Sequence, residues 1–286
     1  MSHIRKPLRL LAGAACVLAI GYLAAIGYLR FNERRYIYQP GDRAVAAPDA
    51  KFGLGETRVT YPSSDGVTLS AWIIPASNNS TPVGWILICH GNYGNIGFGQ
   101  RPEFYASMRD LGLNILAFDY RGFGDSTGSA DERGLHDDAM ASYEYLTKTR
   151  RLRPERLVIF GHSLGSGVAV ELASRVPAAG LIVEGAYTSV AERAQELYPY
   201  FPIQMIATQR FPSIDRMPSI AIPKLFLHSP EDAVIPYAQG HRLFEAASEP
   251  KTFVDVRGGH ENAFREDKAV YYGAIGAFLK GITNVH

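Results

Sequence analysis

The sequence predicts an α/β protein built on a doubly wound, mostly parallel sheet of eight strands flanked by helices. Short apolar runs rich in β-branched residues alternate with longer helical segments, the order that produces parallel strands joined by crossover helices. The 286 residues, of which 47% are hydrophobic, suffice for one large domain with an appendage. The formal net charge is only +1, without a basic stripe, so we expect no nucleic-acid partner.

The N-terminal segment has the length and composition of a membrane-spanning helix. Residues 10–29 are uncharged and mostly apolar, and about 20 such residues cross the hydrocarbon core of a bilayer. We therefore expect residues 1–35 to be a single-pass, N-terminal signal anchor. A cleaved signal peptide and a lipoprotein box at Cys16 are alternative interpretations. Basic residues flank both ends of the segment, so the sequence leaves the side of the membrane open.

Residues 36–286 are expected to form the α/β domain. It begins with an antiparallel hairpin of strands 57–61 and 67–74. Six further strands are expected at 83–89, 113–118, 157–160, 181–184, 224–228 and 251–256. Helices are expected at 102–111, 131–149, 164–175, 237–247 and 261–282. An aromatic insertion at about 187–218 interrupts this alternation and is expected to form a small cap.

A sharp strand-to-helix turn is expected at Ser163. The apolar run 157–160 predicts a buried strand, and the small residues after the serine predict a helix packed against it. Gly161 and Gly165 leave room for the backbone on either side, the pattern of an elbow that lifts a nucleophile clear of the sheet. A second Gly-x-Ser-x-Gly pattern, around Ser126, lies in a polar loop with no strand running into it. We interpret that serine as a turn residue.

A serine hydroxyl needs a base and an orienting carboxylate to act as a nucleophile at neutral pH. In open α/β sheets such groups gather at the carboxyl ends of the strands. Asp232 lies in the loop after the seventh expected strand, and His260 follows the eighth after two glycines. With Ser163 they give the chain order nucleophile, acid, base. Glu231, next to Asp232, and Glu184, at the end of the preceding strand, remain alternative acids.

Two backbone N–H groups are expected to stabilise the oxyanion of an attacked carbonyl. One belongs to Leu164, which follows the nucleophile. The other is expected in the glycine-containing loop after strand 83–89, from Asn92 or alternatively from Tyr93. His90, at the start of this loop, is interpreted as a structural residue that braces the loop by hydrogen bonds.

Five motifs occur in one order along the chain: His90-Gly91-Asn92, residues 119–126, Gly161–Gly165, Glu231-Asp232 and Gly259-His260. Over about residues 36–280 they resemble the α/β-hydrolase superfamily, above all its membrane-anchored branch of α/β-hydrolase-domain-containing serine hydrolases. The resemblance implies an α/β-hydrolase fold and hydrolysis of esters, thioesters or lysolipids. Ser229 departs from the family pattern, which usually has glycine at this place before the acid loop.

The expected substrate-binding residues are aromatic. They are Tyr93 in the glycine-containing loop and Tyr187, Tyr198 and Phe201 in the insertion. Aromatic and Met side chains grouped in this way line an acyl pocket, face a membrane or simply pack the cap onto the sheet. The sequence does not separate these interpretations.

We therefore expect a membrane-tethered serine hydrolase that cleaves carboxylic or thio esters of lipid-like acyl substrates through an acyl-enzyme, without a cofactor. A peptidase or small-ester carboxylesterase and a non-catalytic binding module of the same fold are the alternatives. The histidines form no close pair and Cys-x-x-Cys does not occur, so no metal site is expected. The oligomeric state stays open.

Overall fold

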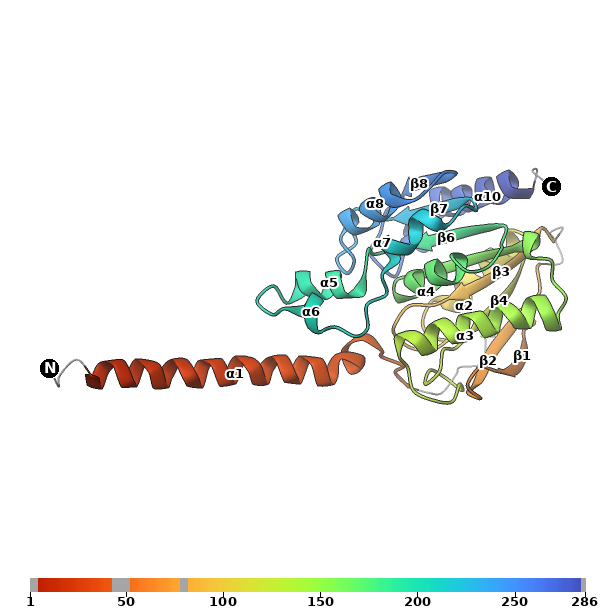
Figure 1. Cartoon of the computed structure of the whole chain (residues 1–286). Helices are drawn as coiled ribbons and strands as arrows, with labels where there is room; N and C mark the ends of the chain where they lie inside the picture. The colour runs from red at the N-terminus through yellow and green to blue at the C-terminus, as the bar shows by residue number, and fades with distance from the viewer. Residues whose placement is uncertain (1–4, 43–51, 78–81, 284–286) are drawn as a thin grey trace.

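An eight-stranded sheet organises the residues that the computed structural model describes, which are 5–42, 52–77 and 82–283. The strand order is β1-β2-β4-β3-β5-β6-β7-β8 (Figure 1). β1 and β2 form an antiparallel hairpin, β2 pairs antiparallel with β4, and all other neighbours are parallel. The strands are β1 (Thr57–Pro62), β2 (Thr68–Ile74), β3 (Gly84–Cys89), β4 (Leu113–Phe118), β5 (Leu157–His162), β6 (Gly180–Glu184), β7 (Lys224–His228) and β8 (Lys251–Asp255). The predicted doubly wound sheet is confirmed.

Helices cover both faces of this sheet. Phe104 of α2 (Arg101–Asp110) and Tyr271 of α10 (Lys268–Thr283) belong to one buried cluster. The cluster on the other face includes side chains of α3 (Glu132–Glu144), α4 (Leu164–Ala173) and α8 (Tyr237–Ala246). Because both faces are covered, the central strands are apolar almost throughout rather than alternating in polarity.

Two predicted helices differ from the observed ones. The helix expected at 261–282 is divided into α9 (Ala263–Glu266) and α10, because Asp267 leaves the helical conformation. Its buried carboxylate accepts the N–H of Arg257 at 3.2 Å. The helix expected at 131–149 is α-helical only to Glu144 and ends in a π-helical turn, η1 (Tyr145–Thr149).

Between β6 and β7, where the sequence predicts a cap, the chain forms α5 (Val190–Leu197), α6 (Ile203–Ile206) and α7 (Ser213–Arg216). Two short 3₁₀ turns, η2 (Pro154–Arg156) and η3 (Met217–Ser219), complete the elements. Figure 1 shows α5 and α6 at the end of the domain from which the N-terminal helix projects.

The N-terminal helix α1 (Arg5–Ile37) is long and apolar enough to cross a membrane. Its last turns are joined to the insertion, since the Glu33 carboxylate accepts the N–H groups of Thr208 and Gln209, both at 2.9 Å. The Tyr38 hydroxyl donates to the side chain of Gln209 at 2.6 Å. The end of α1 is therefore part of the packed structure and not a loose tether.

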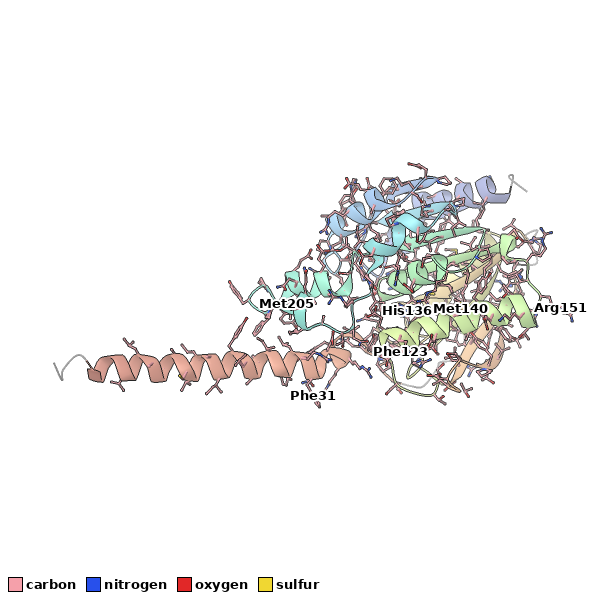
Figure 2. The ribbon with its side chains drawn as sticks, viewed as in Figure 1. Phe31, Phe123, His136, Met140, Arg151 and Met205 are labelled. Atoms are coloured by element: carbon pink, nitrogen blue, oxygen red, sulfur yellow. The ribbon has the colours of Figure 1, made fainter. Side chains whose placement is uncertain are left out.

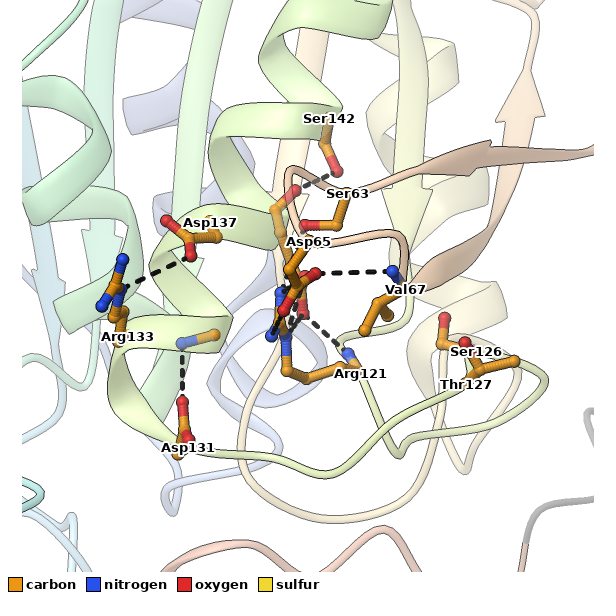
Figure 3. A network of polar contacts seen from close by, with 12 residues as sticks. Ser63, Asp65, Val67, Arg121, Ser126, Thr127, Asp131, Arg133, Asp137 and Ser142 are labelled. Carbon is orange, nitrogen blue, oxygen red and sulfur yellow. Dashed lines mark hydrogen bonds and ion pairs between the residues drawn. The ribbon is translucent and has the colours of Figure 1, made fainter.

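A buried arginine holds the loop after β4 against α3 and the β1–β2 turn. Asp138 of α3 accepts the backbone N–H of Arg121 at 2.8 Å and its guanidinium at 2.7 Å. The same guanidinium donates to Asp65 at 2.6 Å and to Ser63 at 3.2 Å (Figure 3). Asp138 is fully buried, whereas the side chain of Asp65 is 48% exposed.

Replacing Asp138 with alanine is expected to lower the free energy of unfolding by about 3–5 kcal/mol, because the Arg121 guanidinium would stay buried without its inner partner. Urea denaturation followed by tryptophan fluorescence measures the loss. Asp65→Ala is the matched control: this carboxylate contacts the same guanidinium from a half-exposed position, so a much smaller loss is expected. Equal losses in the two variants would contradict this account.

Candidate active site

Ser163 occupies a strained turn between β5 and α4. Its φ of 54° and ψ of −125° lie in a region that non-glycine residues rarely adopt, at a cost of about 1–3 kcal/mol. The turn is fixed by two backbone hydrogen bonds. Ser163 donates its N–H to the carbonyl of Glu184 on β6 at 3.0 Å, and its own carbonyl accepts the N–H of Ser166 at 2.8 Å. In this conformation the Oγ atom lies toward the loop after β8, which carries His260.

Glycines make the close approach of α4 to the sheet possible. A Cβ atom on Gly165 would overlap with the backbone carbonyl of Cys89 at the end of β3. A Cβ atom on Gly161 would overlap with the carbonyl of Gly165 and with the side chain of Ala169. Both glycines are therefore required by the space between β5, β3 and α4, as the sequence pattern predicts.

The structure brings Ser163, His260 and Asp232 together in one hydrogen-bonded chain. The Nε2 atom of His260 lies 2.8 Å from the Oγ atom of Ser163, and its Nδ1 atom lies 2.6 Å from Oδ2 of Asp232. The three residues are each less than 10% exposed. A nucleophile within reach of a base, which is itself oriented by a carboxylate, is the arrangement needed to activate a hydroxyl.

The loop between β7 and α8, which carries Asp232 and is called the acid loop here, favours the ionised form of the Asp232 carboxylate. Its Oδ1 atom accepts the N–H groups of Val234 and Ile235, both at 2.8 Å. Burial by itself opposes ionisation, but the hydrogen bond with His260 and these two N–H groups outweigh it and lower the pKa of Asp232. The Ser229 hydroxyl accepts the N–H of Glu231 at 3.0 Å, so this departure from the family pattern tightens the turn.

The two alternative acids lie elsewhere. Glu231 is exposed at the surface of the acid loop. Glu184 is buried and accepts the hydroxyl of Tyr271 at 2.7 Å, and burial raises the pKa of its carboxyl. Asp232 is therefore the candidate acid whose carboxylate contacts His260 in this structure.

Sequence reasoning missed a contact made by His162, the residue before the nucleophile. Its Nε2 atom lies 2.9 Å from the backbone oxygen of His260, and the two rings are 5.0 Å apart. His162 therefore fixes the loop that carries the candidate base. The signal available in the sequence was its position at the end of β5, the same edge of the sheet at which His260 follows β8.

The candidate oxyanion donors lie in the two segments next to Ser163. Leu164 is the first residue of α4, where backbone N–H groups point out of the helix. The loop after β3 passes directly against the serine, since a Cβ atom on Gly91 would be 3.4 Å from Ser163 Cβ. Asn92 follows Gly91, and its side chain donates to the carbonyl of Ile37 at 3.0 Å, which ties this loop to the end of α1.

His90 is buried beneath the same loop. Its Nδ1 atom lies 2.7 Å from the carbonyl of Gly91, and its ring packs 4.5 Å from that of Tyr120. This placement agrees with the structural role expected for it. Ser126, from the second Gly-x-Ser-x-Gly pattern, donates its hydroxyl to the carbonyl of Asp119 at 2.7 Å and lies in a loop.

A largely apolar cavity of about 330 Å³ adjoins the nucleophile turn. Tyr93, one of the expected substrate residues, lies on its wall and is 47% exposed. His162 and Glu184 supply polar atoms to the cavity. Its aromatic lining is completed by Phe98, Phe104, Tyr105, Phe160 and Phe264. Such a lining suits a hydrocarbon chain or another apolar group.

The other expected substrate residues lie away from this cavity. Tyr187 is 2% exposed and donates its hydroxyl to the carbonyl of Leu164 at 3.0 Å, so its buried side chain stabilises the first turn of α4. Tyr187 does not line this cavity, and its contact with substrate stays a prediction. Phe201 stacks on Tyr22 of α1 with ring centroids 5.4 Å apart, and Tyr198 lines a small cavity between the insertion and α1.

Among the residues that the structure describes, one group of side chains has donor atoms close enough to hold a metal ion. Atoms of His162, His260 and Glu261 lie within 4.8 Å of one another. Both ring nitrogens of His260 are already within hydrogen-bond distance of Asp232 and Ser163, and Nε2 of His162 is used by a backbone carbonyl. A metal here would break the chain of contacts around the serine, so the donors do not fit a metal centre.

Comparisons with known proteins agree with the fold. A family model described as alpha/beta hydrolase fold matches residues 84–201. An uncharacterized protein of Mycobacterium tuberculosis is 37% identical over 268 residues, which are 92% of this chain and 94% of that protein. Lysophosphatidylserine lipase ABHD12 of Danio rerio is 35% identical over 211 residues, 68% of this chain and 53% of the lipase. This chain thus matches about half the length of that lipase.

The structure is similar to that of a solved esterase. Esterase Pf2001 of Pyrococcus furiosus superposes with a TM-score of 0.71 over 86% of this chain and 100% of that chain, at 18% sequence identity. At this identity the likeness establishes the fold.

Replacing Gly165 with alanine is expected to lower the melting temperature or prevent folding, because the added methyl group meets the rigid backbone of β3. Circular dichroism during heating measures the effect. Gly273→Ala, on the exposed side of α10 where nothing lies within 4 Å, is the matched control and is expected to raise helix stability by up to about 1 kcal/mol. A Gly165→Ala protein as stable as wild type would refute the close packing described here.

Proposed function

Because this chain belongs to the α/β-hydrolase superfamily, we propose that it is a serine hydrolase that cleaves carboxylic or thio esters through an acyl-enzyme. The observation that carries the proposal is the unbroken chain of contacts from Asp232 through His260 to Ser163, at 2.6 and 2.8 Å. Backbone strain of the kind seen at Ser163 is typical of active sites, and this favours an enzyme over a scaffold or binding module.

In the proposed mechanism Nε2 of His260 takes the proton of the Ser163 hydroxyl as Oγ bonds to the substrate carbonyl carbon. The carbonyl oxygen becomes an oxyanion, which the backbone N–H groups of Leu164 and Asn92 stabilise. His260 then gives its proton to the departing alcohol or thiol, leaving an acyl group on the serine. A water molecule, deprotonated by the same imidazole, attacks the acyl carbon, and the bond to Ser163 Oγ breaks as this oxygen takes the proton back from His260 and the acid is released. Throughout, ionised Asp232 stabilises the imidazolium.

The proposed substrates are lipid-like acyl esters. Three features support this class: the aromatic lining of the cavity beside the serine, the apolar helix α1, and the similarity to a lysophosphatidylserine lipase. A lysophospholipid combines one acyl chain, which suits the apolar cavity, with a polar headgroup that can remain outside. We place the ester carbonyl at Ser163 and the acyl chain beside Phe104 and Phe160.

Membrane attachment through α1 belongs to the same proposal. The apolar stretch of this helix supports a single-pass anchor within residues 1–35, followed by the hydrolase domain in 36–286. The contacts of Glu33 and Tyr38 with the insertion support a domain held close to the bilayer surface. Lipid substrates would then reach the site without crossing bulk water.

Ser163→Ala is expected to abolish labelling by a fluorophosphonate probe and hydrolysis of p-nitrophenyl esters, because the nucleophile is removed while the backbone turn remains. In-gel fluorescence of the full chain in membranes reads out the labelling. Ser126→Ala is the matched control, since Ser126 stands in the same Gly-x-Ser-x-Gly pattern but outside the chain of contacts from Asp232 through His260 to Ser163, and this variant should keep its labelling. Loss of labelling in Ser126→Ala but not in Ser163→Ala would identify Ser126 as the nucleophile and contradict the proposal.

The rate of p-nitrophenyl ester hydrolysis is expected to rise from acetyl to decanoyl, because longer chains bury more apolar area in the cavity, at roughly 0.8 kcal/mol per buried methylene. Measuring kcat/KM across the series at concentrations below micelle formation tests this. A maximum at acetyl would favour a small-ester carboxylesterase. Cleavage of peptide amides faster than of any ester would favour a peptidase.

A further inference from the structure

A charge-free stretch of the insertion, residues 197–206, forms an exposed apolar surface that the catalytic arrangement does not use. The nearest charged residues along the chain are Glu196 and Arg210. Leu197 is 58% exposed, and Tyr200 and Met205 are each 86% exposed. We call this stretch the apolar tip. Large apolar side chains grouped on a surface in this way mark a contact with a partner or a membrane.

The apolar tip is attached to α1. The hydroxyl of Tyr22 donates to the carbonyl of Tyr200 at 2.8 Å, and the ring of Tyr22 stacks against Phe201. Figure 2 shows Met205 at the end of the domain from which α1 projects, with Arg151 at the opposite end. The exposed surface of the apolar tip is therefore continuous with the apolar surface of α1.

The position of Tyr22 sets the depth of the apolar tip. Tyr22 precedes Leu29, the last residue of the uncharged stretch of α1, by seven positions. At 1.5 Å per residue this places the contact with Tyr200 about 10 Å inside the apolar stretch. Segments that lie in the membrane interface bury their apolar side chains to about 5–10 Å. With α1 in a bilayer, the apolar tip reaches the acyl chains of the same leaflet.

The backbone of the apolar tip is suited to lipid because several of its polar groups have partners within the protein. The N–H groups of Phe201, Ile203 and Met205 donate to carbonyls of the same segment. Gln195 donates from its side-chain amide to the carbonyls of Tyr198 and Phe201. Pro199 and Pro202 have no N–H group to satisfy. Internal pairing of this kind favours contact with lipid, since water is absent there to bind unpaired backbone groups.

We propose that residues 197–206 insert into the lipid bilayer beside α1, in the leaflet nearest the hydrolase domain. The inference rests on the membrane anchoring included in the proposed function and adds a second attachment point. Two attachment points, the helix and the apolar tip, fix the rotation of the domain about the α1 axis. The insertion that follows β6 therefore faces the lipid, from which an acyl substrate enters.

Depth-dependent fluorescence quenching of the full chain in phosphatidylcholine vesicles tests the proposal. A polarity-sensitive dye is attached to Met205→Cys in a Cys16→Ser background, and acyl chains that carry a doxyl quencher are then introduced. The native Cys16, exposed on α1, reports the anchor itself in the wild-type chain, since Cys89 is buried. Arg151→Cys in the Cys16→Ser background is the matched control at the far end of the domain.

The dyes at positions 16 and 205 are expected to lose most of their emission to the quencher, whereas the dye at 151 keeps it. Quenching at 16 without quenching at 205 would overturn the proposal and leave the anchor intact. No quenching at either 16 or 205 would overturn both. A dye at 205 that is shielded from water but insensitive to the lipid quencher would assign the apolar tip to a protein contact, which also contradicts the proposal.

Discussion

The close packing of α4 against the end of β5 is the constraint on which the rest of the site depends. It holds Ser163 in a backbone conformation that non-glycine residues rarely adopt. The close packing is possible only because Gly161 and Gly165 carry no side chain. The strain is balanced by the buried contacts of α4 with both neighbouring strands. Once the hydroxyl is fixed at the edge of the sheet, the loops after β7 and β8 need only deliver an acid and a base to it.

Helix α1 and the candidate site are physically connected. Gln39, two residues beyond α1, pairs in parallel with Tyr93, and the Asn92 side chain donates to Ile37. The loop expected to supply an oxyanion donor is thus braced by the segment that leaves the apolar helix. On the other side, Glu33 binds the backbone of the insertion. A change in the position of α1 would act on the loop after β3, which lies beside Ser163, and on the insertion, so the helix has a structural role in addition to any attachment.

Local patterns in the sequence predicted the fold because the apolar run of each central strand and the turn residues that bound it lie within the segment's own sequence. The grouping of Ser163, Asp232 and His260 could be predicted from their places at strand ends, although their roles remain a prediction. Contacts between distant segments could not be predicted in this way. Tyr187 was expected to bind substrate because it is aromatic and lies in the insertion, yet its hydroxyl donates to the first turn of α4. Phe201 stacks on Tyr22 of α1, which is far away in the chain. The break at Asp267 depends likewise on a tertiary contact.

The central claim is that the hydroxyl of Ser163 becomes acylated during turnover. Mass spectrometry of peptides from enzyme mixed with a p-nitrophenyl ester and quenched in acid within the first turnovers tests it most directly. The account predicts an acyl adduct on the peptide that contains Ser163, which disappears as the ester is consumed. An adduct on a different side chain, or steady hydrolysis with no adduct on Ser163 at any time, would contradict it.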